Sequence, residues 1–279
     1  MCAAIRASHF MYGDRPLIIE DPFAIELISP DLRERYLDGN ELGRNGGASI
    51  VLGRARYTED LLEAAVRSGI DQYIILGAGL DTFALRRPDL VGKVRVYEID
   101  HPETQKWKRE LLTQINRELP SELEFIPADL ERETVAEALD RSSFRTERRA
   151  FFSWLGTLPY LTHEAIIRTL ESLAAATAAG SEIVFDYRVS MEFIEPEDVP
   201  LVETGDRLAA ASGEKKRSFL NPKAFMGEIS ATGCEVIESL TPKQIAERYF
   251  AGRNDVARPA SHQYYAHLKN TGIVRQKWQ

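Results

Sequence analysis

Residues 73–81 read YIILGAGLD, a continuous apolar run that ends in the turn Gly77-Ala78-Gly79. A short apolar run bounded by glycine is typical of a strand that is buried on both faces of a parallel sheet. Because glycine has no side chain, a ligand can lie against the backbone of a turn at the carboxyl end of such a strand. The stretch therefore predicts the first strand of a doubly wound sheet and a candidate ligand turn. A tight turn that binds nothing is the alternative.

Further apolar stretches follow this run, and segments with helical periodicity separate them. Strands that alternate with helices predict βαβ units, in which right-handed crossovers build a mostly parallel sheet covered on both faces. We therefore expect the α/β class, with a Rossmann-like, mostly parallel, seven-stranded sheet, helices on both faces and an N-terminal helical cover. The expected strands are residues 73–76, 94–97, 124–126, 150–153, 182–185, 234–239 and 263–268.

The length of 279 residues fits a single domain that spans residues 1–279. Residues 1–53 form the expected N-terminal helical cover, and the glycine-rich stretch from Asp38 to Gly53 predicts a loop or lid within it. Residues 54–279 form the expected core, with an insertion at about 186–220 that interrupts the alternation of strands and helices.

Composition narrows the class of partner. Lysine and arginine number 35 and aspartate and glutamate 43, a net charge of −8 that disfavours a polyanionic nucleic-acid partner. The two cysteines are too few for a disulfide framework, and no HxxxH or CxxC spacing indicates a metal site. No apolar run approaches the about 20 residues of a membrane helix, and the N-terminus lacks the apolar region of a secretory signal. We therefore expect a cytoplasmic protein without a membrane, nucleic-acid or metal partner.

Acidic residues follow the second and third expected strands. Asp100 lies about 20 residues beyond the glycine turn, at the position from which a carboxylate accepts hydrogen bonds from ribose hydroxyls. Asp129 follows the third strand, where a carboxylate can accept a hydrogen bond from an adenine amino group. These features follow successive strands, and together they predict a site for an adenosine-containing cofactor.

The turn departs from the pattern of dinucleotide-binding proteins. A third glycine is expected three residues beyond the second, but this chain has Thr82 there, and Asp81 would turn a negative charge toward a pyrophosphate. S-adenosyl-L-methionine has no phosphate, and its sulfonium and ammonium groups are cationic, so acidic surroundings suit it. It is therefore the favoured cofactor. An NAD(P)-dependent oxidoreductase and a non-catalytic binder of an adenosine ligand stay open as alternatives.

The motifs LGAGLDT (residues 76–82), YEIDHPETQKWKRELL (97–112) and PADL (127–130), in this order, resemble those of the leucine carboxyl methyltransferase family. The likeness extends over nearly the whole chain. It is strongest to a bacterial branch of predicted S-adenosylmethionine-dependent methyltransferases, many of them linked to secondary metabolism. The resemblance implies the Rossmann-like class I methyltransferase fold, S-adenosyl-L-methionine as the cofactor and a small-molecule methyl acceptor.

The resemblance also implies which residues bind the cofactor. Gly77 and Gly79 match the glycine turn of the family, Asp100 matches its second-strand acid, and Asp129 with Leu130 matches its Asp-Leu pair. We therefore expect these residues to line one cofactor site at the carboxyl edge of the sheet.

Two further positions concern the cofactor's methionine carboxylate and the loop after the fourth strand. In the family an arginine ahead of the first strand reaches the methionine carboxylate of the cofactor, and Arg56 corresponds to it best, with Arg54 as the alternative. Many members carry a glutamate after the fourth strand, where this chain has Leu155. The contacts around residues 153–160 are therefore left open.

Tyr160 and His163 are the candidate catalytic residues, because they follow the fourth strand near the edge where a methyl acceptor would approach. Core packing for Tyr160 and a solvated helix start for His163 are the plainer interpretations. A carboxylate acceptor is ionised at pH 7 and needs no base, whereas a phenol or alcohol needs one such as His163. We expect an O-methyltransferase with a carboxylate acceptor slightly favoured over a hydroxyl. The identity of the acceptor and the choice between monomer and homodimer are open.

Overall fold

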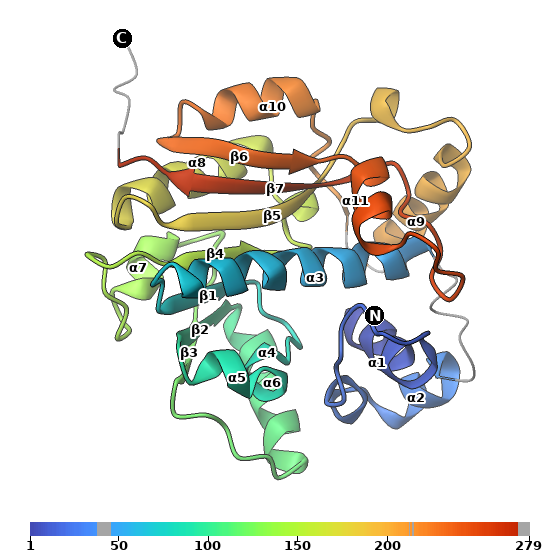
Figure 1. The fold of residues 1–279 in the computed structure, drawn as a ribbon, viewed down its shortest axis with the longest axis horizontal. Coiled ribbons are helices and arrows are strands. Elements are labelled where there is room, and N and C mark those ends of the chain that lie inside the picture. Colours follow the sequence, from blue (N-terminus) through green and yellow to red (C-terminus); the bar gives the residue numbers. More distant parts are fainter. Residues whose placement is uncertain (38–45, 212, 214, 273–279) are drawn as a thin grey trace.

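The structure is a computed structural model that describes residues 1–37, 46–211, 213 and 215–272. Within these residues, seven strands form one sheet in the order β3-β2-β1-β4-β5-β7-β6, with helices on both sides of it (Figure 1). The strands are β1 (Gln72–Leu76), β2 (Arg95–Asp100), β3 (Leu123–Pro127), β4 (Phe151–Trp154), β5 (Glu182–Arg188), β6 (Cys234–Leu240) and β7 (Gln263–Asn270).

The direction of the strands confirms the expected fold only in part. Strands β3, β2, β1, β4 and β5 pair in parallel, but β7 runs antiparallel to both β5 and β6. The sheet is therefore mixed rather than wholly parallel. The difference arises because the connection from β6 to β7, residues 241–262, which contains α11 (Pro242–Tyr249), leads back to the neighbouring position, so β7 runs through the sheet in the opposite direction.

Helices cover both faces of the sheet. Alternate residues of β1 are therefore buried against different groups of helices. On one face, Tyr73 and Ile75 of β1 share a core cluster with α3 (Gly46–Arg67), α4 (Phe83–Arg86) and α5 (Pro88–Val91). On the other face, Ile74 and Leu76 pack in a cluster with α7 (Val135–Leu139), α8 (His163–Ala176) and α10 (Pro222–Ile229). Helix α6 (Pro102–Gln114) connects β2 to β3.

The N-terminal region consists of short helices that lie beside the sheet (Figure 1): α1 (Cys2–Tyr12), a 3-10 turn η1 (Ala24–Leu27) and α2 (Pro30–Tyr36). The expectation of a loop or lid over residues 38–53 is wrong for its second half, because α3 already begins at Gly46. Residues 38–45 lie outside the described residues. The division into a single domain with cover, core and insertion stays a prediction. The segment proposed as the insertion contains η3 (Met191–Phe193) and α9 (Val199–Ala211).

In the described part of the chain, no helix combines the length and the apolar character needed to cross a bilayer. The cytoplasmic location stays a prediction.

A buried ion pair lies beneath the carboxyl end of β2. The Nζ atom of Lys108, on α6, is 2.5 Å from Oε2 of Glu98, and both side chains are at most 3% exposed. Burial raises the pKa of Glu98 to about 7, although Lys108 acts in the opposite direction. Gln105 donates from Nε2 to the Glu98 carbonyl at 3.0 Å. The pair therefore fixes α6 against β2, two residues before Asp100.

The pair can be tested by substitution. At pH 8 we expect Lys108→Met to lower the free energy of unfolding by about 3–5 kcal/mol, because it leaves the Glu98 carboxylate buried without a cation. The double variant Glu98→Gln/Lys108→Met should recover part of that loss. Since Glu98 alone would take up a proton in the folded state, the loss in Lys108→Met should be smaller at pH 5.5 than at pH 8. Urea unfolding at both pH values measures this, and equal losses would contradict it.

Candidate functional site

The glycine turn lies at the carboxyl end of β1 with both glycines in the left-handed region. The φ angles are +68° at Gly77 and +49° at Gly79. A Cβ atom on Gly77 would lie 2.5 Å from Cγ2 of Thr157, whereas a Cβ atom on Gly79 would meet nothing within 4 Å. Gly77 is therefore required by packing, and Gly79 leaves its side of the turn open.

Asp100 holds this turn from the end of β2. The Gly79 amide donates to Oδ2 of Asp100, and the His101 amide donates to Oδ1 at 2.6 Å. The carboxylate thus lies directly beside the turn, and its expected role toward ribose hydroxyls stays a prediction. Asp100 thus links the carboxyl ends of the parallel strands β1 and β2. This edge of the sheet is where α/β proteins bind ligands.

A cavity of about 490 Å³ opens between the ends of β2, β3 and β4. Gly77, Asp100, Asp129 and Leu130 all line it, together with Trp154. The Asp129 carboxylate accepts from the Glu131 amide at 3.1 Å and lies 3.2 Å from Nε of Arg132 at the surface. The structure therefore brings together the acids that follow the second and third strands.

A second cavity, of about 230 Å³, lies on the other side of the turn, between α1, α3 and the loop that follows β4. Gly77 and Thr157 line both cavities, so the two meet at the glycine turn. Gly79 and Leu155 also line the second cavity, and so does Arg54. A ligand that extends in both directions from the turn would occupy the pair.

Arg54 is held in the second cavity by the buried carboxylate of Asp186. The distance from Nη1 of Arg54 to Oδ2 of Asp186 is 3.0 Å, and the arginine side chain is 14% exposed. Asp186 also accepts from the Gly156 amide at 2.6 Å and from Nε2 of Gln263 at 2.5 Å. Burial would lower the pKa of Arg54, but Asp186 and other neighbours raise it above its usual value. The guanidinium is therefore a permanent cation at the cavity wall.

Three other residues named from the sequence, Arg56, Tyr160 and His163, line neither cavity. The Arg56 side chain pairs with Asp60 one turn along α3 and lines neither cavity. His163, in the first turn of α8, has its Nε2 atom 2.6 Å from Oε2 of Glu228 on α10. Neither His163 nor Tyr160 is among the described residues that line the cavities.

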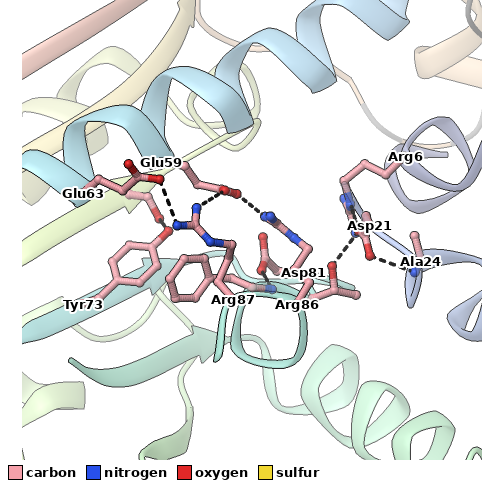
Figure 2. Close-up of polar contacts among 12 residues, drawn as sticks. Arg6, Asp21, Ala24, Glu59, Glu63, Tyr73, Asp81, Arg86 and Arg87 are labelled. Atoms are coloured by element: carbon pink, nitrogen blue, oxygen red, sulfur yellow. Dashed lines mark hydrogen bonds and ion pairs between the residues drawn. The ribbon is translucent and has the colours of Figure 1, made fainter. Parts of the chain in front are cut away.

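Two further guanidinium groups border the second cavity and were missed in the sequence. Arg6 comes from α1 and Arg86 from α4 (Figure 2). Arg86 forms an ion pair with Glu59, and Glu59 also lies 2.8 Å from Arg87. Nothing in the local sequence of Arg6 or Arg86 indicates a site. By contrast, Asp186 could have been noticed, because a charged residue within the apolar run of β5 needs a buried partner.

The structure also bears on metals. Among the residues that it describes, no group of three or more His, Cys, Asp or Glu side chains is arranged to hold a metal ion.

Comparison with known proteins indicates one family, both from a family profile and from an individual relative. A sequence profile of the family described as leucine carboxyl methyltransferase matches residues 1–174. YktD of Bacillus subtilis (strain 168), a predicted S-adenosyl-L-methionine-dependent methyltransferase, is 32% identical over 277 residues that cover 91% of this chain and 90% of that protein.

Solved structures share the fold. A predicted methyltransferase from Thermobifida fusca YX matches with a TM-score of 0.62 at 15% identity, over 96% of this chain and 94% of that one. A DUF574 family protein from Streptomyces avermitilis MA-4680 matches with a TM-score of 0.59 at 18% identity, over 96% and 97%.

The family match and the relative from Bacillus subtilis define an S-adenosyl-L-methionine-dependent methyltransferase, and the sheet order and the glycine turn with its neighbouring carboxylate agree with that class. The chain belongs to the leucine carboxyl methyltransferase family, and S-adenosyl-L-methionine is its cofactor. The alternatives of an NAD(P)-dependent oxidoreductase and of a non-catalytic binder are thereby set aside.

The guanidinium of Arg54 lies close to the backbone of Gly156, and a substitution of this glycine tests that contact in the wall of the second cavity. In Gly156→Ala, a Cβ atom would lie 2.6 Å from Nη2 of Arg54 at a φ of +71°. We expect the free energy of unfolding to fall by about 1–3 kcal/mol or more, because clash and backbone strain add. Gly252→Ala is the matched control, since its φ is +75° with nothing within 4 Å of the added atom. Equal losses in the two variants, measured by urea unfolding, would show that Arg54 does not press on Gly156.

Proposed function

We propose that this methyltransferase acts on the oxygen of a small molecule and that its acceptor is a carboxylate. The observation that supports a carboxylate acceptor most strongly is the set of side chains that line the second cavity. Among the described residues that line it, the titratable side chains are three arginines, Asp81 and Cys2, without histidine or tyrosine. A carboxylate is ionised at neutral pH and needs no base, so this lining suits it. Since this cavity of about 230 Å³ would also take the methionine end of the cofactor, the space left beside it suits a small-molecule acceptor.

We propose that the two cavities hold the two ends of the cofactor. The 490 Å³ cavity would take the adenosine, with Asp100 accepting from the ribose hydroxyls and Asp129 with Leu130 at the adenine. Gly77 and Gly79 would let the chain of the cofactor pass against the backbone, which the open side of Gly79 supports. The second cavity would take the methionine end, where Arg54 offers a fork of donors to a carboxylate.

When bound, S-adenosyl-L-methionine supplies an electrophilic methyl group on a cationic sulfonium. The contribution of the protein is to orient the acceptor in line with that group and to exclude water. Val51, Ala55 and Leu155 give the second cavity apolar walls that serve the second task. Leu155 takes the position where many family members have glutamate, so this wall is less polar here.

A phenol or alcohol acceptor is the second candidate, and it requires a general base. His163 is the base that the sequence offers, but it is bound to Glu228 and lies outside both cavities. This geometry favours the carboxylate. A role in secondary metabolism rests on the family resemblance. The choice between monomer and homodimer stays open.

The choice between Arg54 and Arg56 has a direct test. We expect Arg54→Lys to weaken the binding of S-adenosyl-L-homocysteine about tenfold, because lysine keeps the charge but loses the planar fork. Arg56→Lys should bind as the parent protein does, since Arg56 pairs with Asp60 away from the cavities. Isothermal titration calorimetry measures both. A loss confined to Arg56→Lys would instead assign the methionine carboxylate to Arg56.

The class of acceptor can be read from the product. We expect turnover with a panel of small carboxylic acids to give methyl esters, which mild alkali cleaves to methanol, whereas methyl ethers survive. The rate at saturating acceptor should change little between pH 6 and pH 8, because a carboxylate with a pKa of about 4 is already ionised there. Alkali-stable products from phenols, with a rate that rises with pH, would favour the hydroxyl acceptor.

A further inference from the structure

Asp21 is a fully buried carboxylate that joins the N-terminal region to the loop after the glycine turn (Figure 2). Its Oδ2 atom accepts from Nε of Arg6 at 2.7 Å and from Oγ1 of Thr82 at 2.6 Å. Its Oδ1 atom accepts from the Ala24 amide at 3.0 Å. Burial would raise the pKa of Asp21, but Arg6, Arg86 and the Thr82 hydroxyl lower it below its usual value. The carboxylate is therefore ionised, and its contacts are charge-assisted.

Arg6 makes a second contact with the same loop. Its Nη2 atom donates to the Leu80 carbonyl at 2.7 Å. Helix α1 therefore holds the loop both directly, at Leu80, and through Asp21, at Thr82. The two anchored residues lie on either side of Asp81, immediately after Gly79.

The anchored loop carries the amide that meets Asp100. Gly79 donates its N–H to the Asp100 carboxylate, and the next residue is the one whose carbonyl Arg6 binds. Glycine loses more conformational freedom on ordering than any other residue, so a turn with two glycines depends on outside contacts to keep one conformation. Here those contacts come from the N-terminal region, since the Asp21–Thr82 bond spans 61 residues of the chain and the Arg6–Leu80 bond spans 74.

We propose that Asp21 is a positioning residue of the cofactor site, which acts through Thr82 and Arg6 to hold residues 79–82 in the conformation that binds the cofactor. The N-terminal region is then a working part of the site rather than only a cover. This inference rests on the proposed placement of the cofactor at the glycine turn. It predicts that weakening the link lowers cofactor affinity even where the fold keeps its stability.

Thr82 offers the mildest test, because it touches neither cavity and is isosteric with valine. We expect Thr82→Val to raise the dissociation constant of S-adenosyl-L-homocysteine about tenfold, the size expected for the loss of one hydrogen bond to a charged group. Thr82→Ser keeps the donor and should bind within about twofold of the parent protein. In steady state, Thr82→Val should raise KM for S-adenosyl-L-methionine and leave kcat nearly unchanged.

Thr58→Val is the matched control. Thr58 is equally buried, at 2% exposed, and in the described part of the structure its hydroxyl has no hydrogen-bond partner. The control should therefore leave the affinity unchanged. Urea unfolding of the variants separates a loss of affinity from a loss of stability.

The outcomes discriminate between the inference and its basis. Parent-like affinity in Thr82→Val, or equal losses in the valine and serine variants, or an equal loss in Thr58→Val, would overturn the positioning role. Asp100→Asn tests the placement of the cofactor by itself. If Asp100→Asn weakens binding and Thr82→Val does not, the site stands and the positioning role fails. If Asp100→Asn binds normally, the placement of the cofactor at the glycine turn is wrong.

Discussion

A carboxylate that has lost all contact with water must be surrounded by donors, and Asp186, within β5, is such a group. Its donors come from different parts of the chain: Arg54 of α3, Gln263 of β7 and the Gly156 amide after β4. To satisfy one buried charge, the fold has to bring four elements to one point. That point is the wall of the second cavity, so the requirement that stabilises the fold also sets the place of the guanidinium in the site.

The strands were predictable because their signal is local. Most contain a short apolar run, and the predicted ranges fall on the observed strands to within a few residues. The start of α3 was not predictable in this way, since Gly46, Gly47 and Gly53 indicate a loop. Position 53 requires glycine within this helix for a reason that the local sequence does not contain: a Cβ atom there would lie 2.7 Å from the hydroxyl of Tyr265. The direction of β7 likewise depends on a return that apolar periodicity does not encode.

The residues of the candidate site also fall into those that a local sequence signal predicts and those that depend on contacts between distant segments. Gly77, Gly79, Asp100 and Asp129 follow strand ends, where the order of strands in an α/β sheet brings side chains together. Arg54 and Arg56 could not be separated by sequence, because residues two apart on a helix point to nearly opposite sides and either side could meet the site. The choice between the two arginines depends on which face of α3 packs beside Gly156. The part that Arg6 of α1 plays in the site could not be predicted either, because a contact between distant segments produces no motif in the local sequence.

One consequence concerns how ligand occupancy could be followed by fluorescence. Cys2 is exposed and lies at the rim of the second cavity, with its sulfur 3.6 Å from Nη2 of Arg54, whereas Cys234 is buried on β6. A thiol-reactive dye would therefore attach selectively to one end of α1. The emission of that dye would respond to whatever fills the space beside Arg54. The chain thus carries a natural attachment point for an optical reporter, without the introduction of any new cysteine.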